Sequence, residues 1–311
     1  MNATRVARRV LQTIPTLFAI VVVTFLIVRL LPGDPASAMI GDRVTDAEVA
    51  RENARLGLDR PLVVQFGAYV AGLARGDLGR STSLGVPVTQ LLAARLPVTL
   101  LLTAMASLIA VAVSVPLALL AALNRGGLLD MSIRGAFQVG LSMPAFYIGI
   151  LMLTWLAARL RLFPVGGYGS GAAGHVVHLL LPALSLALSL SAVLMRNLRA
   201  AICEVLDSPH VEFARLKGLE PALVLRRHVL RNALVSTVTL FGLSAGSLLG
   251  GAVVTETVFA IPGVGTLMID SVFARDYPVI EALTLVLAAL VVLTLLVTDL
   301  IQAALDPRAE T

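Results

Sequence analysis

Long apolar runs alternate with short charged segments along the whole chain. A run of about 20 apolar residues is long enough to cross a bilayer as a helix. The pattern therefore predicts an all-α membrane protein with six transmembrane helices. The segment 179–195 is short, and it would cross the bilayer only near the normal or with an extension at one end. The expected spans are residues 10–31, 97–123, 136–158, 179–195, 233–255 and 279–301.

The first apolar run is preceded by Arg5, Arg8 and Arg9, and residues 36–38 (Ala-Ser-Ala) faintly resemble a signal-peptidase site. A secretory signal has an apolar core of about 7–15 residues. The run over 10–31 exceeds that length, so we interpret it as a retained first helix.

Basic residues predict the orientation in the membrane. With the N-terminus inside, most arginines and the single lysine, Lys217, fall on the cytoplasmic side. This distribution follows the positive-inside rule and predicts that both termini are cytoplasmic. Arg159, Arg161 and Arg275 are the exceptions in the short outer loops.

Composition supports a membrane protein and excludes several alternatives. The chain is 58% hydrophobic and only 14% charged, whereas a soluble domain carries about 25% charged residues. The net charge of +5 could suggest a nucleic-acid partner. However, the arginines cluster at the ends of apolar runs, which is typical of membrane orientation. Cys203 is the single cysteine, which excludes an intrachain disulfide and a cysteine metal cluster.

We expect three regions along the chain. Residues 1–31 form the N-terminus and first span, 32–96 form an extracytoplasmic cap, and 97–311 form the core with a cytoplasmic segment at about 204–231. In the cap, Thr45, Glu48 and Gly57 have the spacing of a capped helix. Pro61 should begin a second helix, which should pack or lie on the membrane surface because one apolar stripe carries Leu62, Phe66, Val70 and Leu73.

Prolines and glycines mark particular positions within the spans. Proline removes a backbone hydrogen bond, so kinks are expected at Pro116, Pro144 and Pro182. Glycines recur every fourth residue in the fifth span, which predicts close helix contact, inside this subunit or with a partner, at Gly242, Gly246 and Gly250.

Several chemistries lack the residues that they need. The middle of each expected span has no charged residue, which disfavours a proton- or sodium-driven transporter. The sequence has no Walker A or HExxH motif, so we do not expect this chain to hydrolyse ATP or to act as a metalloenzyme. His175 and His178 are three residues apart, but two imidazoles without a further ligand make a weak metal site.

The most charged segment between two apolar runs predicts a docking element. Residues 212–217 can form a short helix, Gly218 can end it, and Pro221 suits the first turn of the next helix. Ala214 and Gly218 are small and four residues apart, so another protein's surface could approach closely there. The alternative is a basic loop that only fixes topology.

The same segment resembles a known family. Residues 212–218 are similar to the EAA loop of bacterial ABC importer permeases, with Phe213 in place of the central alanine and 228–231 (HVLR) in place of the final IxLP. Residues 214–219 (ARLKGL) and 227–234 (RHVLRNAL) resemble the corresponding run of peptide permeases. Further similar stretches follow in family order at 31–35, 76–79, 178–184, 256–265 and 274–278. Together they resemble the B-type membrane subunit of the dipeptide/oligopeptide/nickel permease family.

The resemblance implies a type I ABC importer permease fold in the bacterial inner membrane. It implies a complex with a second homologous permease (C-type), two ATPase subunits or domains that bind ATP and magnesium, and an extracytoplasmic substrate-binding protein; no cofactor is implied in this chain, which is not itself an enzyme. The implied ATPase-docking coupling helix contains Glu212, Phe213, Ala214, Lys217 and Gly218. The implied cargo is a di- or oligopeptide moved by alternating access. Nickel or a nickel chelate is an alternative cargo, and a secondary transporter or channel is an alternative of another class.

A second candidate site is the glycine turn after the fifth span. It contains Pro262, Gly263, Val264 and Gly265. Such turns serve both recognition and packing. The segment could project toward the binding protein, or it could be a re-entrant turn packed on the outer end of the bundle.

Overall fold

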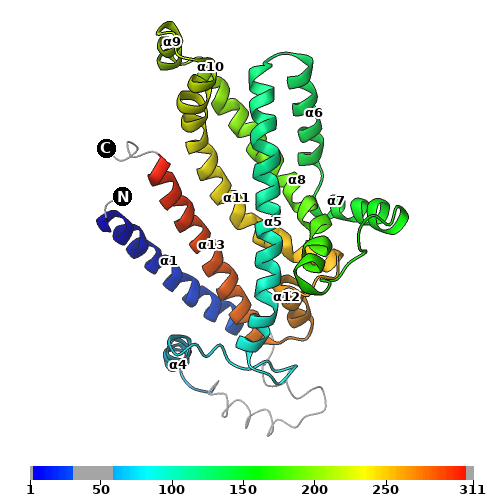
Figure 1. The fold of residues 1–311 in the computed structure, drawn as a ribbon. Helices are drawn as coiled ribbons and strands as arrows, with labels where there is room; N and C mark the ends of the chain where they lie inside the picture. Colours follow the sequence, from blue (N-terminus) through cyan, green and yellow to red (C-terminus); the bar gives the residue numbers. More distant parts are fainter. Residues whose placement is uncertain (1–2, 31–58, 306–311) are drawn as a thin grey trace.

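The computed structural model describes residues 3–30 and 59–305, and helices dominate this part of the chain (Figure 1). A single isolated β-bridge, between Arg80 and Pro87, occurs in the described residues. The long helices α5, α8 and α11 pack side by side, and α13 lies between α11 and α1. The elements are α1 (Ala3–Leu30), α4 (Leu62–Ala74), α5 (Val88–Leu123), α6 (Leu128–Ser142), α7 (Ala145–Met152), the π-helical η1 (Leu153–Arg159), α8 (Gly171–Leu206), α9 (Pro209–Leu216), α10 (Pro221–Leu223), the π-helical η2 (Val224–Leu230), α11 (Arg231–Val258), α12 (Val264–Phe273) and α13 (Tyr277–Leu305).

Four continuous helical segments are long and apolar enough to cross a membrane. They are Val88–Leu123, Gly171–Leu206, Pro221–Val258 and Tyr277–Ala304. The pair α6 and α7–η1 would be a fifth span if it is counted as one, but it is bent by 99°. The first expected span corresponds to α1, whose described apolar part is Leu11–Leu26.

Two spans differ from the sequence prediction. The fourth extends beyond 179–195 at both ends, because α8 is 36 residues long and continues through Pro182. The extension expected for this short run is therefore present, and the flanking histidines and arginines had lowered the apparent length of its apolar part. The third is not one continuous helix over 136–158, and the kink expected at Pro144 is a complete break with a bend of 99°. Met143 takes an extended conformation, as sterics before a proline favour, and Pro144 begins α7 in a new direction. Pro144 therefore breaks the helix, whereas α5 contains Pro116 in its interior.

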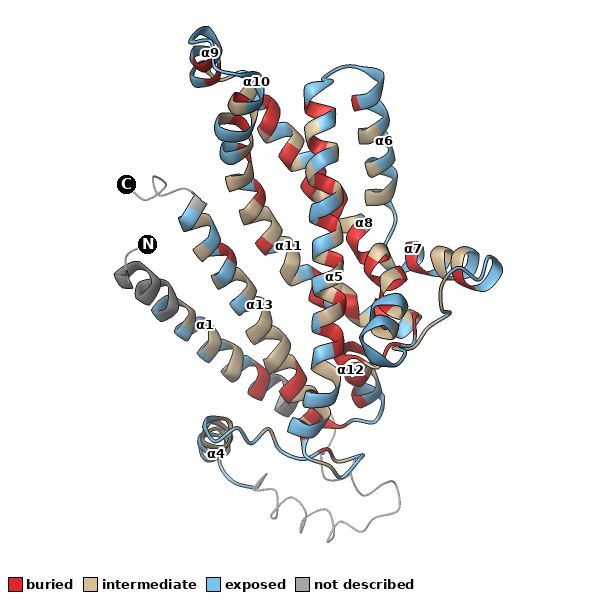
Figure 2. Ribbon diagram, viewed as in Figure 1, coloured by how far each residue is buried: buried red, intermediate tan, exposed pale blue. Residues whose placement is uncertain are grey.

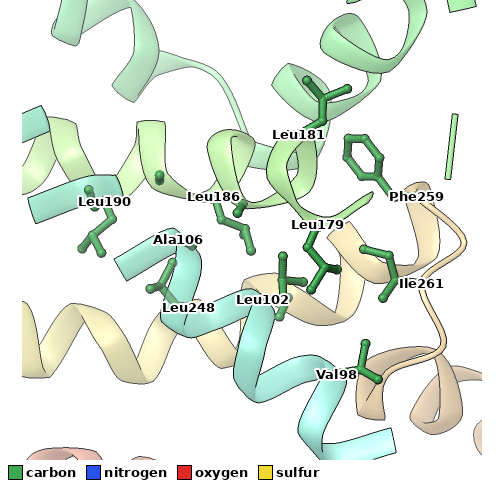
Figure 3. Packing of buried hydrophobic residues seen from close by; sticks show 14 of the residues in the cluster. Val98, Leu102, Ala106, Leu179, Leu181, Leu186, Leu190, Leu248, Phe259 and Ile261 are labelled. Carbon is green, nitrogen blue, oxygen red and sulfur yellow. The ribbon is translucent and has the colours of Figure 1, made fainter. Parts of the chain in front are cut away.

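The main hydrophobic core joins α5, α8 and α11 (Figure 3). Leu102, Leu186 and Leu248 are buried where the three helices meet. Alanines at Ala106 and Ala187 are also buried, and such small residues let helix backbones approach closely. Figure 2 shows that the buried residues of α5 and α8 face the bundle interior, while α6 is exposed on most of its surface.

The glycine ridge on α11 packs against α13 inside this subunit. A Cβ atom added at Gly242 would clash with the side chain of Thr298, and one at Gly246 would lie 3.1 Å from Val291 Cγ1. A Cβ atom at Gly250 would meet nothing within 4 Å. The ridge is therefore an internal helix contact over its first two glycines.

This difference predicts opposite outcomes for two alanine substitutions. Gly242→Ala should destabilise the purified protein by about 1–3 kcal/mol because α11 and α13 must separate to admit the methyl group. Gly250→Ala is the matched control and should leave the thermal unfolding temperature in detergent unchanged or raise it, since alanine favours helix. Equal effects of the two substitutions would contradict the packing described here.

At the end of the bundle remote from α9 (Figure 1), α4 packs on α1 through aromatic rings. Phe66 lies edge-on to Phe18 and Phe25, with ring centroids 6.2 and 5.1 Å apart. Pro61 directly precedes α4, so the predicted second cap helix is present. Phe66 of its apolar stripe packs on α1, whereas Leu62 of the same stripe is 56% exposed. The predicted capped helix at Thr45, Glu48 and Gly57 lies outside the described residues.

Candidate functional site

Helix α9 stands apart from the membrane bundle, at the end where α8 finishes (Figure 1). It begins with Pro209 at its first turn, a position where the missing N–H costs nothing. The chain leaves it through Lys217 and Gly218 and enters α10 at Pro221. The predicted short helix, glycine turn and second helix are therefore present, with the first helix starting three residues earlier than residue 212.

Gly218 ends α9 in the left-handed conformation, with φ of +74°. Its N–H donates to the carbonyl of Arg215 at 2.9 Å, and the Leu219 N–H donates to the carbonyl of Ala214 at 3.3 Å. This pair of bonds is the Schellman arrangement, which favours glycine because a Cβ atom is disfavoured at positive φ. The turn fixes the direction in which the chain leaves the helix.

The inner face of α9 anchors it to the bundle. Val211 and Ala214 are buried and belong to a cluster with Leu198 and Ile202 of α8 and Val229 of η2. Ala214 and Gly218 therefore do not share an accessible face: Ala214 points inward, and Gly218 is exposed. The small side chain of Ala214 brings α9 close to α8 within this chain.

The outer face of α9 exposes apolar surface. Phe213 is 60% exposed and Leu216 is 78% exposed, and three-residue spacing places them on one side of the helix. The Lys217 Nζ atom lies 4.9 Å from the Phe213 ring centroid, within the range of a cation–π interaction. Glu212 is exposed beside them. An exposed pair of large apolar side chains on a protruding helix is typical of a protein–protein contact.

Among the described residues, three ion pairs lie at the α9 end of the bundle, and two of them join different helices or segments. Asp130 of α6 is buried and accepts hydrogen bonds at 2.6 Å from both Nε and Nη2 of Arg199 of α8. Arg125 and Asp207 pair at 2.7 Å, but both side chains are exposed, so this bond contributes little to stability. The buried bidentate pair joins α6 to α8, beside the apolar packing of Ile133 and Phe137.

The predicted outer turn at 262–265 is packed inside this chain. Gly263, Val264 and Gly265 are buried and Pro262 is half-buried. A Cβ atom at Gly263 would clash with the Glu256 carboxylate, and one at Gly265 would clash with the Val253 backbone. These glycines thus let the start of α12 lie directly on α11. The geometry agrees with the re-entrant packing interpretation. The exposed large apolar residues of α12 are Val272, at 54%, and Phe273, at 84%.

Glu256 organises that packing. Its Oε2 accepts hydrogen bonds from the N–H groups of Gly265 and Thr266, at 2.7 and 3.2 Å. Its Oε1 accepts a 2.5 Å bond from the Thr99 hydroxyl, which in turn accepts the Val264 N–H at 2.9 Å. One buried carboxylate therefore caps the N-terminus of α12, where negative charge is favoured, and ties α5 to α11.

A second carboxylate fastens the turn that precedes α5. Asp276 Oδ2 accepts hydrogen bonds from the Ser81 and Ser83 hydroxyls at 2.5 and 2.7 Å, and Oδ1 accepts the Thr82 N–H at 3.1 Å. Burial alone would raise the pKa of Asp276, but these hydrogen bonds outweigh it and hold the pKa below the ordinary 3.8. The charged form thus binds the 80–87 turn to the α12–α13 connection.

The sign of this shift gives a pH prediction. Because the pKa of Asp276 is lower in the folded chain, its stabilising effect is complete above the ordinary value of 3.8 and is lost as pH falls through the lowered pKa. Hydrogen-exchange protection factors at Thr82 and Ser83 should therefore persist at pH 5 and fall below pH 3.8. Asp276→Asn should lower them at pH 5, whereas Asp270→Asn, at an exposed position of α12, should not. Unchanged protection in Asp276→Asn would contradict this role.

His175 and His178, the candidate metal pair of the sequence, both contact backbone carbonyl groups. His175 Nδ1 lies 2.9 Å from the Tyr168 carbonyl, and His178 Nδ1 lies 2.8 Å from the Gly174 carbonyl. The His175 ring also stacks on Tyr168, with centroids 3.9 Å apart. Within residues 3–30 and 59–305, no group of three or more potential ligands gathers around a common point.

Comparison with known proteins identifies the family. Residues 114–311 match the model of the binding-protein-dependent transport system inner membrane component, and residues 4–103 match the model of its N-terminal part. The chain belongs to this permease family. It is therefore a multi-pass inner-membrane permease subunit of an ABC transporter, as the resemblance of the 212–234 segment had indicated.

Three relatives align over nearly the whole permease. The probable peptide ABC transporter permease protein y4tP of Sinorhizobium fredii is 38% identical over 97% of this chain and 98% of its own length. The oligopeptide transport system permease protein AppB of Bacillus subtilis is 37% identical, with 99% of each chain covered. The di/tripeptide transport system permease protein DppB of Pseudomonas aeruginosa is 39% identical, with 97% of each covered.

A solved structure supports the fold. A chain of the inward-facing MetNI methionine ABC transporter superposes with a TM-score of 0.60 and 18% identity, covering 70% of this permease and 97% of that chain. Both are type I ABC importer permease folds, so the predicted fold class is confirmed.

Sequence reasoning missed the three carboxylate contacts made by Asp130, Glu256 and Asp276. Each joins residues far apart in the sequence, such as Asp130 and Arg199 or Glu256 and Thr99, and no local spacing reveals these distant partners. A signal did exist for Glu256, since an acid at the end of an apolar run precedes a glycine turn by seven residues. A carboxylate in that position can cap the helix that follows the turn.

Proposed function

We propose that this permease is the B-type membrane subunit of an ATP-driven importer of di- and oligopeptides. The observation that carries the proposal is α9, an anchored helix with an exposed apolar face outside the bundle. The reported relatives support the cargo, because their names refer to peptide, oligopeptide or di/tripeptide transport.

The partner at α9 is an ATPase subunit. Phe213 and Leu216 supply apolar anchors for a groove on that subunit, and Glu212, Lys217 and Gly218 lie on the same exposed segment. Two such ATPases bind ATP and magnesium, and this chain holds no cofactor and catalyses no reaction itself. A second, C-type permease and an extracytoplasmic binding protein complete the complex. Docking at α9 places that end of the bundle, and both chain termini, in the cytoplasm.

The contacts that anchor α9 transmit movement of the ATPases to the membrane helices. ATP binds more tightly when the ATPases are closed together, and this differential affinity drives the change. Movement of α9 is passed through Val211 and Ala214 to α8 and η2, and η2 continues into α11. The helices of the two permeases then rock between inward- and outward-open arrangements. At the other end, Phe273 of α12 is 84% exposed and supplies an apolar contact for the binding protein.

The alternatives are less well supported. The names of the reported relatives favour peptide over nickel as cargo. Membership in a binding-protein-dependent permease family argues against a self-sufficient secondary transporter or channel.

Gly218→Trp tests whether the exposed turn is part of the docking surface. Gly218→Ala is its control, because alanine and tryptophan share the strain of positive φ, about 1–2 kcal/mol, while only tryptophan adds bulk in the open space beside α9. We expect Gly218→Trp to lower uptake at least tenfold relative to Gly218→Ala at equal membrane levels. Equal uptake by the two variants would remove Gly218 from the docking surface.

Reconstitution tests the function as a whole. Proteoliposomes that hold this permease with its ATPases, second permease and binding protein should accumulate a labelled tripeptide only when ATP is supplied. Nickel should not accumulate in the same vesicles. Peptide accumulation by vesicles that contain this chain alone would contradict the proposal.

A further inference from the structure

A groove of ≈ 460 Å³ lies between α6 and α8. Its walls are largely apolar, but arginines from both helices also line it. Two of its residues, Phe137 and Met195, also belong to the cluster that anchors α9, so the groove lies toward the α9 end of the bundle. The lining residues are Met131, Arg134, Gly135, Phe137, Gln138, Leu141, Ala192, Met195, Arg196, Arg199 and Ala200.

The groove carries excess positive charge. Its three arginines have one buried carboxylate beside them, that of Asp130, and Arg199 occupies both oxygens of that group. Asp130 Oδ2 also accepts the Gly126 N–H at 3.0 Å, and Arg134 Nε lies 3.3 Å from Oδ1. The groove lining thus holds three arginines and no carboxylate, and Asp130 pairs with two of the three, Arg199 and Arg134.

Two of these cations are accessible. The Arg134 side chain is 53% exposed, and Arg196 is exposed as well. Among the described residues, the ion pairs at this end involve Arg125, Arg134 and Arg199 but not Arg196. A guanidinium group binds phosphate through paired N–H donors, so an anionic headgroup is the natural ligand of this pair.

The groove changes from charged to apolar along its length. Going away from the α9 end, α6 contributes Arg134 and then Leu141, while α8 contributes Arg196 and then Ala192. The helices run in opposite directions here (Figure 1), so Arg134 and Arg196 lie toward the α9 end of the groove and Leu141 and Ala192 lie farther from that end. This order matches a phospholipid, with its phosphate at the membrane surface and its acyl chain inside.

We propose that the groove between α6 and α8 binds an anionic phospholipid, with the phosphate between Arg134 and Arg196 and one acyl chain along Phe137, Leu141 and Ala192. Basic pockets between membrane helices on the cytoplasmic side are suited to such headgroups. The lipid joins α6 to α8 beside the cluster that anchors α9. The proposal does not depend on the cargo.

Native mass spectrometry of the purified transport complex tests the site with added phosphatidylglycerol and with phosphatidylethanolamine as the zwitterionic comparison. The wild-type complex should bind phosphatidylglycerol more tightly than phosphatidylethanolamine. The double variant Arg134→Ala/Arg196→Ala should lose roughly thirtyfold in that affinity, since each basic residue near the surface contributes about fivefold. The control Arg226→Ala/Arg227→Ala removes the same charge at exposed positions of η2 and should keep the affinity. Equal binding of both lipids, or an equal loss in the control, would overturn the proposal.

The acyl-chain part of the site has its own matched pair on α6. Gly135 lines the groove, Gly140 does not, and a Cβ atom added at either meets nothing within 4 Å. Gly135→Phe should fill the groove and lower phosphatidylglycerol binding about tenfold with every arginine in place, whereas Gly140→Phe should not. Unchanged binding in Gly135→Phe would place the lipid elsewhere.

A competition experiment separates a lipid from a peptide carboxylate. A tripeptide with a free C-terminus should not displace phosphatidylglycerol from the wild-type complex. Displacement by that peptide, but not by its C-terminal amide, would overturn the lipid assignment and make the arginine pair a cargo site.

Discussion

Phe213→Asp should reduce ATP-driven peptide uptake by roughly a hundredfold while leaving the permease in the membrane at its normal level. Phe213 is 60% exposed on α9, so the substitution removes little contact within this chain. At an interface, loss of a central aromatic anchor costs about 2–4 kcal/mol, and an aspartate placed in an apolar groove adds a desolvation cost. Peptide uptake and the amount of ATPase that co-purifies with the permease should fall together.

The control for this prediction is Leu84→Asp. Leu84 is 59% exposed in the turn before α5, remote from α9 (Figure 1), so the same charge is introduced at a similar exposure. It should leave ATPase co-purification unchanged. Normal uptake by Phe213→Asp, with the ATPase still bound, would show that α9 docks through other residues or does not dock at all.

Glu256→Ala should prevent the permease from reaching a stable fold. The substitution removes an acceptor of three hydrogen bonds, from Thr99, Gly265 and Thr266. Each buried donor left without a partner costs about 1–3 kcal/mol, so the total is a large part of the stability of a typical domain. The N-terminus of α12 would separate from α11, and the packing of Val264 against α5 and α13 would be lost with it.

Fluorescence-detected size exclusion after mild heating measures this effect. Glu256→Ala should lose its monodisperse peak, and Glu256→Gln should retain part of it because the amide oxygen still accepts hydrogen bonds. Glu204→Ala, at an exposed position of α8, should behave as wild type. A normal peak for Glu256→Ala would show that the carboxylate does not hold α12 in place.

The sequence predicted the helical membrane architecture because hydrophobicity over about 20 residues is a local property. It also predicted the end of α9, since Gly218 and Pro221 mark a turn through their own backbone preferences. The direction of each side chain could not be predicted in the same way. Ala214 was expected on an accessible face, yet it is buried because the anchoring residues on α8 are far away in the sequence.

The outer turn shows a related limit. The glycines at 263 and 265 predicted a turn, but a turn can project or pack. Packing was decided by Glu256 and Val253 of α11, which occupy the space that a Cβ atom would need. In the third span, Pro144 predicted a kink, but the size of the bend could not be predicted, because the residues on both sides of the proline are apolar. Hydropathy measures which solvent a segment prefers and does not detect a change in its direction.

We propose that this permease works as one subunit of an ATP-driven complex docked through α9. The most direct test is purification of the chain from its native membrane in a mild detergent, followed by identification of the bound proteins and an ATPase assay. Our account predicts that a second permease and ATPase subunits co-purify, that the preparation hydrolyses ATP, and that Phe213→Asp releases the ATPase while the second permease stays bound. Purification of the chain alone, or only with copies of itself, would contradict it.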